Sequence, residues 1–142
     1  MATEQTLGII KPDAVQDGHI GDIIAMIERA GLAIRGIRMV HLTREQASRF
    51  YAVHEGKFFY EGLVNFMTSG PVVILAIEGE GAISRWRALM GPTDSTQAGP
   101  DTVRGRYGKT VSINAVHGSD APETARHEVA FFFGEEARIR PA

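Results

Sequence analysis

The residues best suited to chemistry lie in the stretch Asn114-Ala115-Val116-His117-Gly118-Ser119-Asp120. His117 ends an apolar run typical of a strand and precedes a glycine and two small polar residues, so we expect its ring at a sheet edge, open to solvent. An imidazole placed this way can act as a base, a metal ligand or a nucleophile. The rest of the chain favours phosphate as the group that it meets. The candidate partners are Lys11, Arg87, Thr93, Arg104 and Asn114.

These partners come from three places in the chain. Lys11 follows an apolar run and precedes Pro12, which predicts an ammonium presented at a defined turn where a strand ends; the alternative is a lysine that extends into solvent. Arg87 lies near the end of an expected helix, and Arg104 lies in a long loop. Single surface arginines are common, but several near Thr93 could clamp phosphate oxygens through charge-assisted hydrogen bonds.

Asn114 precedes His117 by three residues, and this odd spacing is a constraint. On a regular strand, residues an odd number apart face opposite sides, so both reach one site only if the chain bends there. Otherwise Asn114 is a buried amide satisfied by the backbone. Glu128, on an expected helix, either returns to orient the imidazole of His117 or lies on a solvated face.

Other patterns in the chain do not indicate a site. Gly108-Lys109-Thr110 is not a P-loop, because Val103 stands where the pattern requires glycine and because the segment precedes a strand rather than a helix. Four further histidines have no convergent partners and no metal-ligand spacing, so we expect them on the surface or in the core: His19, His41, His54 and His127.

The aromatic residues of the middle helices are a further candidate. Tyr51 and the run Phe58-Phe59-Tyr60 are expected mainly in the core. One of them on an outward face could instead stack on a nucleobase, and such stacking tolerates any base.

Composition sets bounds on class and location. The chain has 142 residues, a formal net charge of −2 and no cysteine. It is long enough for a real core, and the absence of cysteine excludes thiol catalysis, zinc–thiolate sites and disulfides. A near-neutral charge gives no general attraction to nucleic acid or to an anionic membrane. With a polar N-terminus and no run of membrane-spanning length, the protein is expected in the cytoplasm.

Hydrophobic periodicity predicts one α/β domain over residues 1–142, with a charged tail at 134–142. Strands are predicted at 7–10, 34–42, 72–77 and 111–116, and helices at 20–30, 43–51, 58–67, 80–90 and 122–133. The run Thr43-Arg44-Glu45-Gln46 predicts a capping box at the start of the second helix. Residues 91–110 show no clear period. This order of elements fits either a parallel sheet or a split βαβ arrangement with an antiparallel sheet.

Five blocks of the sequence, taken together, resemble a nucleoside diphosphate kinase. They run in unbroken order over nearly the whole chain, from about residue 5 to residue 133. The blocks are Ile10 to Asp13, Leu63 to Val73, Gly91 to Thr93, Arg104-Gly105 and Asn114 to Asp120. The resemblance implies an α+β fold, with a ferredoxin-like βαββαβ core, a four-stranded antiparallel sheet and covering helices.

The resemblance also implies a ping-pong reaction. His117 would take the γ-phosphate of a nucleoside triphosphate, mainly ATP, hold it as phosphohistidine and pass it to a nucleoside diphosphate of any base. Ser119 and Glu128 would support and orient His117. Tyr51 would line the site near Lys11.

The remaining residues implied by the resemblance hold the nucleotide. Lys11 would contact the phosphates and the ribose 3′-hydroxyl, Asn114 that same hydroxyl, and Phe59 would stack on the base. The residues implied for the β- and γ-phosphates are Arg87, Thr93 and Arg104. Mg²⁺ would be carried on the phosphates, with no protein metal ligand named. The expected partners are nucleoside di- and triphosphates and other copies of the chain, in a tetramer, hexamer or dimer, with no membrane and no specific nucleic acid.

Three positions depart from the family pattern. Ser95 stands where proline is common in the loop, Arg106 replaces an acidic residue and Ile113 replaces a polar or basic one. None of them is a proposed catalytic or phosphate-contacting position, so the departures concern the loop and assembly rather than the chemistry.

Two competing hypotheses remain. A ferredoxin-like module that binds nucleotide or RNA without catalysis would carry aromatics on strands and a basic surface, since fold alone does not establish function. A catalytically silent member of the family would have lost His117 or the arginines, and all are present.

Overall fold

Strands β1 (Thr3–Ile10) and β3 (Val72–Glu80) form the centre of an antiparallel sheet in which Leu7 lies opposite Ala76. The computed structural model describes residues 3–134. The edge strands are β2 (Ala33–Val40), which pairs with β3, and β4 (Val116–Gly118), which pairs with β1. The strand order is β2-β3-β1-β4 and every pairing is antiparallel. The parallel alternative is therefore wrong, and the ferredoxin-like expectation is confirmed.

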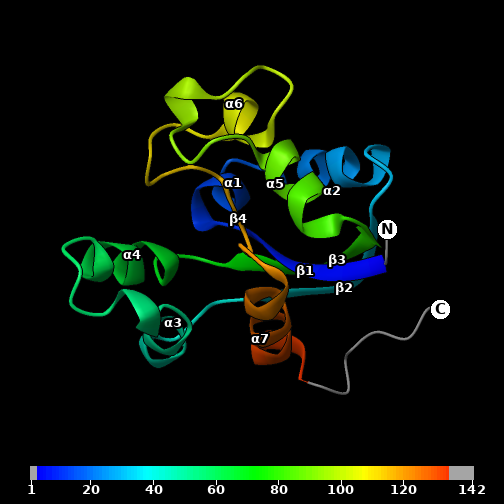
Figure 1. Cartoon of the computed structure of the whole chain (residues 1–142). Coiled ribbons are helices and arrows are strands. Elements are labelled where there is room, and N and C mark those ends of the chain that lie inside the picture. The colour runs from blue at the N-terminus through cyan, green and yellow to red at the C-terminus, as the bar shows by residue number, and fades with distance from the viewer. Residues whose placement is uncertain (1–2, 135–142) are drawn as a thin grey trace.

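Helices cover both faces of this sheet (Figure 1). Helices α2 (Ile20–Arg29) and α5 (Ala82–Met90) lie on one face, and α7 (Pro122–Phe133) lies on the other. The sheet has two cores because successive strand residues point to opposite faces. Ile10 and Leu75 pack beneath α2 and α5, whereas Ile9 and Ile74 pack against α7 and its neighbours.

Two shorter helices project beside α7 at one end of the sheet (Figure 1). Helix α3 (Arg44–Phe50) begins with the predicted capping box, in which the side chains and backbone of Thr43 and Gln46 bond reciprocally. After a 3₁₀ turn, η1 (Ala52–His54), helix α4 (Tyr60–Met67) starts two residues later than predicted. Phe58 and Phe59 thus precede the helix instead of lying within it.

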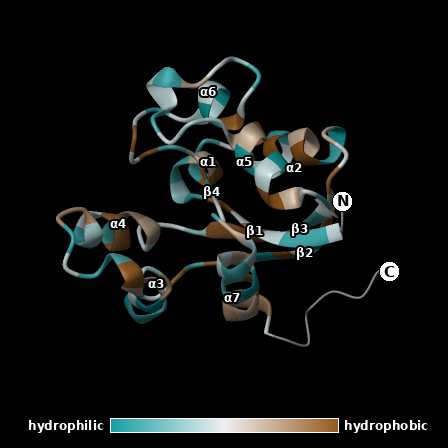
Figure 2. Cartoon of the chain, in the orientation of Figure 1, coloured by the Kyte–Doolittle hydropathy of each residue, from teal (hydrophilic) through white to brown (hydrophobic). Residues whose placement is uncertain are grey.

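The connection at 91–110 is ordered, although its sequence has no clear period. It contains a 3₁₀ turn, η2 (Ser95–Gln97), and helix α6 (Val103–Tyr107), and a further short helix, α1 (Pro12–Gln16), follows β1. In Figure 2, α6 and the loop before it are coloured largely hydrophilic or neutral, in contrast to the hydrophobic strands.

The predicted strand at 111–116 is wrong for most of its length. Only Val116 belongs to β4, while Val111 and Ile113 are exposed. Local bonds replace the ladder there, because the backbone N–H groups of Ser112 and Ile113 donate to the Thr110 hydroxyl. The predicted charged tail lies outside the described residues apart from Gly134.

No helix within residues 3–134 is long and apolar enough to cross a membrane.

Candidate active site

The backbone turns sharply between Asn114 and His117, at Ala115. The φ of Ala115 is 72°, and the N–H of Val116 donates to the carbonyl of Asn114 at 2.8 Å, which closes a γ-turn of the rare left-handed kind. This bend frees Asn114 and His117 from the opposite-face geometry of a regular strand. The chain therefore bends between these two residues, which the sequence analysis required if both are to reach one site.

The imidazole of His117 is held by Glu128 from α7. Its Nε2 lies 2.9 Å from Glu128 Oε1, which also accepts a 2.8 Å bond from the Ser119 hydroxyl. Burial alone would raise the pKa of Glu128, but the bonds from His117 and Ser119 outweigh it and lower that pKa, so the carboxylate is ionised and can only accept. Nε2 therefore carries a proton, and in the neutral ring Nδ1 is left with its lone pair.

The backbone of His117 is fixed from the opposite face of the sheet. The indole Nε1 of Trp86, a fully buried residue of α5, donates to the His117 carbonyl at 3.2 Å. The next residue must be glycine, because a Cβ at Gly118 would come within 2.8 Å of the indole and 2.6 Å of Met90. Close packing thus sets the distance between the His117 backbone and α5.

Two buried cations lie beside the γ-turn. Lys11, 7% exposed, donates from Nζ to Asn114 Oδ1 at 2.8 Å. The pKa of Lys11 is lowered to about 8, mainly by burial and also by Arg104, while Asp13 opposes the shift. Arg104 donates to the carbonyls of Gly91, Asn114 and Val116, and its pKa is lowered to about 10 by burial and by Arg87. Neither side chain forms an ion pair within residues 3–134, although a buried cation favours one.

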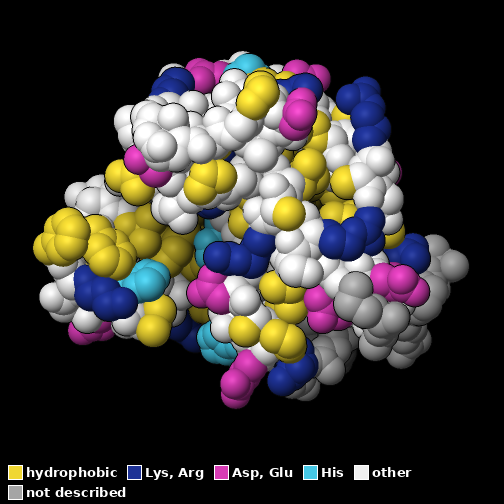
Figure 3. All heavy atoms as spheres, turned by 45° about the horizontal axis from the view of Figure 1, so that its top comes forward, with side chains coloured by type: hydrophobic (Ala, Val, Ile, Leu, Met, Phe, Trp, Pro, Cys, Tyr) yellow, Lys and Arg dark blue, Asp and Glu magenta, His cyan; other side chains and the backbone are white. Residues whose placement is uncertain are grey.

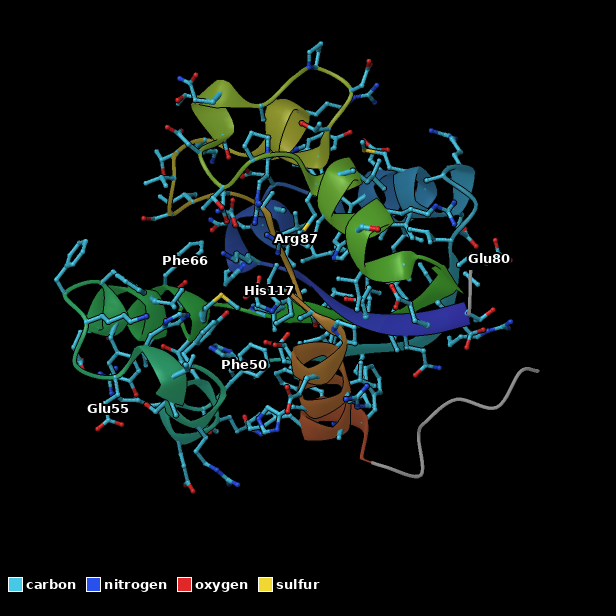
Figure 4. All side chains as sticks on the ribbon, viewed as in Figure 1. Phe50, Glu55, Phe66, Glu80, Arg87 and His117 are labelled. Carbon is cyan, nitrogen blue, oxygen red and sulfur yellow. The ribbon has the colours of Figure 1, made fainter. Side chains whose placement is uncertain are left out.

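Arg87 and Thr93 lie at the more exposed side of these cations. Arg87 forms a 2.8 Å ion pair with Asp120, and the two side chains are 46% and 77% exposed. Figure 4 shows Arg87 above His117, between the sheet and the α6 segment. The carbonyl of Thr93 accepts from the Asn114 amide at 3.1 Å, and its side chain is exposed. Asn114 therefore ties the loop to the turn.

A row of rings leads from the His117 side to the α3–α4 projection. Tyr51 lies 6.3 Å from the rings of both His117 and His54, and His54 lies 5.1 Å from the ring of Phe59. Phe59 is partly exposed, with the Lys57 ammonium 5.8 Å from its ring centroid. In Figure 3 this projection carries a hydrophobic tip, and a hollow separates it from the body of the molecule.

The hydroxyl of Tyr51 is buried and has no hydrogen-bond partner among residues 3–134. Burial and the nearby Glu128 raise the pKa of Tyr51, so the phenol stays protonated and is a donor without an acceptor. Such a group is costly unless something else accepts from it. A ligand oxygen between Tyr51 and the cations would do so.

Comparison with known proteins decides the family. Residues 4–138 match the family model described as nucleoside diphosphate kinase. The chain belongs to the nucleoside diphosphate kinase family. It is similar to nucleoside diphosphate kinase 1 of Protochlamydia amoebophila (strain UWE25), with 56% identity over 133 residues, covering 94% of each chain.

Two solved structures of nucleoside diphosphate kinases superpose closely on the chain. That of Aquifex aeolicus has a TM-score of 0.94 and 42% identity, covering 98% of this chain and 100% of its own. That of Halobacterium salinarum, in complex with CDP, has a TM-score of 0.93 and 40% identity, covering 99% and 94%. The chain is therefore an enzyme of the phosphotransferase class.

The residues that the kinase resemblance predicts for the site fall into connected groups. Hydrogen bonds join Lys11, Asn114, Arg104 and the backbone of Thr93 around the turn, and a second set joins His117, Ser119 and Glu128. Four further residues contact these groups without having been predicted: Asp13 beneath the turn, Trp86 behind the histidine, Asp120 on Arg87, and His54 beside Phe59.

His54 corrects a prediction, since it does have partners. Its Nδ1 lies 3.3 Å from the Lys57 ammonium, and its ring lies between those of Tyr51 and Phe59. Burial lowers the pKa of His54, with smaller lowering contributions from Lys57 and His117 and an opposing one from Asp120. These partners are local in the chain: Tyr51, His54 and Lys57 follow one another at a spacing of three, a signal that the prediction did not use.

The three departures from the kinase pattern leave the site intact. Ser95 lies in η2 with a buried hydroxyl that has no partner among the described residues. Arg106 donates to the Pro100 carbonyl at 3.0 Å, and Ile113 is partly exposed. Arg104 is held by three carbonyls, so its placement does not depend on an acidic residue at 106, and three bonds leave two of the five N–H groups of the guanidinium for a ligand.

Proposed function

We propose that this chain transfers the γ-phosphate of a nucleoside triphosphate, mainly ATP, to nucleoside diphosphates through a phosphohistidine on His117. One observation carries the mechanism: Glu128 occupies Nε2 of the ring and leaves Nδ1 as the nucleophile. Nδ1 forms a bond to the γ-phosphorus, the bond to the β–γ bridging oxygen breaks, and the nucleoside diphosphate leaves. The second half-reaction reverses these steps with a different diphosphate.

The cations around the turn suit this reaction electrostatically. Phosphoryl transfer passes through a loose transition state, so catalysis depends on in-line positioning and on neutralising spread charge. Lys11 and Arg104 are buried without an ion pair in the described part of the chain, and triphosphate oxygens would supply counter-charge. Arg87 would exchange Asp120 for a phosphate oxygen, while the Tyr51 hydroxyl would gain an acceptor.

The nucleoside would extend from the turn toward the α3–α4 projection. Asn114 and Lys11 would contact the ribose 3′-hydroxyl, and Phe59 would stack on the base. Stacking engages the π-face that every base presents, so the proposal includes broad base specificity. The Halobacterium salinarum relative was solved in complex with CDP, which supports a nucleotide as the ligand.

The proposal includes Mg²⁺, which would bind mainly through the nucleotide phosphates. The side chains around the turn are mostly cationic, and the one exposed carboxylate beside them, Asp120, is paired with Arg87. A bare cation is repelled by such a site, whereas a cation shielded by phosphate oxygens is admitted, and Mg²⁺ prefers phosphate oxygens and waters. When bound, the ion would neutralise phosphate charge. The cytoplasmic location and the homo-oligomeric state stay predictions.

The decisive experiment is a labelling and chase. The protein is incubated with γ-labelled ATP and Mg²⁺, the label is mapped, and GDP or CDP is then added. We expect acid-labile, alkali-stable label on His117 that leaves with either acceptor. His117→Ala should bind nucleotide with the same fold and carry no label.

Turnover retained in His117→Ala would refute His117 as the nucleophile. Nucleotide binding by the wild type without any label would instead favour a ferredoxin-like binding module.

A further inference from the structure

Ala115 occupies a backbone conformation that its side chain disfavours. Its φ of 72° lies in the left-handed region, where the Cβ of an L-residue crowds the following carbonyl and where glycine is the usual residue. Strained residues persist only where their surroundings hold them, and they concentrate at functional sites. The surroundings of Ala115 must therefore hold this turn.

Two hydrogen bonds from the β1–α1 junction hold the peptide groups of Ala115. Its carbonyl accepts from the backbone N–H of Lys11 at 2.8 Å, and its own N–H donates to Asp13 Oδ2 at 3.1 Å. Ala115 is fully buried and Asp13 is 9% exposed, so water competes little for either bond. The Asp13 carboxylate is the one side chain among residues 3–134 that bonds to the Ala115 backbone.

We propose that Asp13 is a positioning residue for phosphoryl transfer, whose carboxylate holds the left-handed turn at Ala115 and thereby sets Asn114 relative to His117. The inference rests on the proposed function, because it concerns the geometry of the same site. Without Asp13 the N–H of Ala115 is left buried and unpaired, which is costly. The turn can relieve that cost by leaving positive φ, and this rotates Asn114 away from its place beside the Lys11 ammonium.

The first arm of the test compares three variants. Asp13→Ala should slow single-turnover phosphorylation of His117 by about ten- to a hundredfold, the scale of one buried donor left unpaired. Asp13→Asn keeps an oxygen that can accept the same N–H and should stay within about fivefold of the wild type. Asp17→Ala is the matched control: it removes the carboxylate that follows the same short helix, whose exposed partner is Lys109, and should leave the rate unchanged.

The second arm tests the strain directly. Glycine adopts positive φ without the Cβ penalty, so Ala115→Gly in the Asp13→Ala background should restore the rate by about five- to thirtyfold. Ala30→Gly is the control, because Ala30 has an ordinary φ of −74°, and it should restore nothing. If Asp13 only stabilised the fold, Ala115→Gly would restore the rate of Asp13→Ala no better than Ala30→Gly does.

Two further readouts separate this inference from the proposed function. At about pH 6, where Lys11 stays charged without Asp13, the Kd for ADP in Asp13→Ala should change less than the labelling rate does, because Arg87, Arg104 and Phe59 are untouched, so most of the loss falls on the chemical step. Amide hydrogen exchange at Ala115 should be slow in the wild type and faster in Asp13→Ala, whether or not the protein transfers phosphate. A wild type that takes no label would refute the kinase and leave this exchange measurement standing.

The outcomes are decisive in either direction. If Asp13→Ala labels His117 as fast as Asp17→Ala does, Asp13 does not position the site. If Asp13→Ala is unfolded, the double variant with Ala115→Gly carries the test, since relief of the strain should restore fold and rate together. A double variant that stays inactive overturns the proposal.

Discussion

The buried ammonium of Lys11 predicts how nucleotide affinity depends on pH. Its pKa of about 8 in the free protein arises from burial and from Arg104. A phosphate beside the ammonium favours its charged form and moves the pKa back up. Binding must therefore be accompanied by proton uptake whenever Lys11 is neutral in the free protein, and affinity falls above that pKa.

The size of the effect follows from the two protonation states. With a pKa of about 8, roughly nine-tenths of Lys11 is charged at about pH 7 and roughly one-tenth at about pH 9. The Kd for a nucleoside diphosphate should rise about tenfold over that range, which corresponds to about 1.4 kcal/mol. Arg104, with a pKa of about 10, stays mainly charged, and His54, with a lowered pKa, stays neutral.

The assay is a calorimetric or fluorescence titration with ADP at fixed ionic strength from about pH 7 to pH 9. Lys11→Arg is the matched variant, because a guanidinium keeps its charge over this range. We expect Lys11→Arg to bind ADP more weakly than the wild type at every pH, with a Kd that does not change over this pH range. A flat profile in the wild type, or the same slope in both proteins, would refute the argument from burial.

Three further substitutions test the site. Asn114→Ala should lower turnover by roughly ten- to a thousandfold, the scale of one positioned donor, measured as kcat with saturating nucleotide; near-normal turnover would remove Asn114 from the site. Glu128→Gln should slow labelling of His117 by roughly ten- to a hundredfold, the cost of weakening a charge-assisted hydrogen bond; unchanged labelling would mean that the tautomer is set by other groups. Asp120→Asn should tighten ADP binding by up to about fivefold at low salt, because Arg87 loses an exposed competitor whose pairing is worth about 1 kcal/mol or less. That gain should fade in about 1 M salt, and a gain that persists would mean that Asp120 acts otherwise.

Much of the fold could be predicted from local patterns. The central strands and the long helices follow from apolar periods of two and of 3.6, because burial against a layer on either face enforces those periods. The capping box at Thr43 is a short-range signal and is confirmed in detail. Strand direction is not a local property, and it came from the family resemblance instead.

The wrong strand prediction at 111–116 has a physical cause, which is competition from local hydrogen bonds. Val111, Ile113 and Ala115 alternate with polar residues as a strand would, but the Thr110 hydroxyl captures two backbone N–H groups and bends the chain. Helix α6 escaped prediction for a different reason, since its five residues span less than two turns and show no repeated period. It also contains Gly105, where a Cβ would lie 1.9 Å from the Gly99 carbonyl oxygen.

Candidate site residues could be predicted from the sequence where the residue type itself indicates the chemistry. Lysine, arginine and histidine flanked by small residues indicate phosphate, and the fold brings Lys11 and Arg104 to Asn114, in the turn that precedes His117. Asp13 could not be found this way, because it gains its partner only through a contact with a distant segment. The partners of His54 lie within five residues of it, so that contact was a local signal that the prediction did not use.

The bond between the Trp86 indole and the His117 carbonyl gives the molecule an optical reporter. Trp86 is the one tryptophan of the chain, so its fluorescence is not mixed with that of another indole. Its ring is sealed from solvent and attached to the backbone of the histidine that would carry the phosphate. A change in charge on that histidine alters the field at the indole, so emission intensity could follow each half-reaction in a stopped-flow instrument without any added dye.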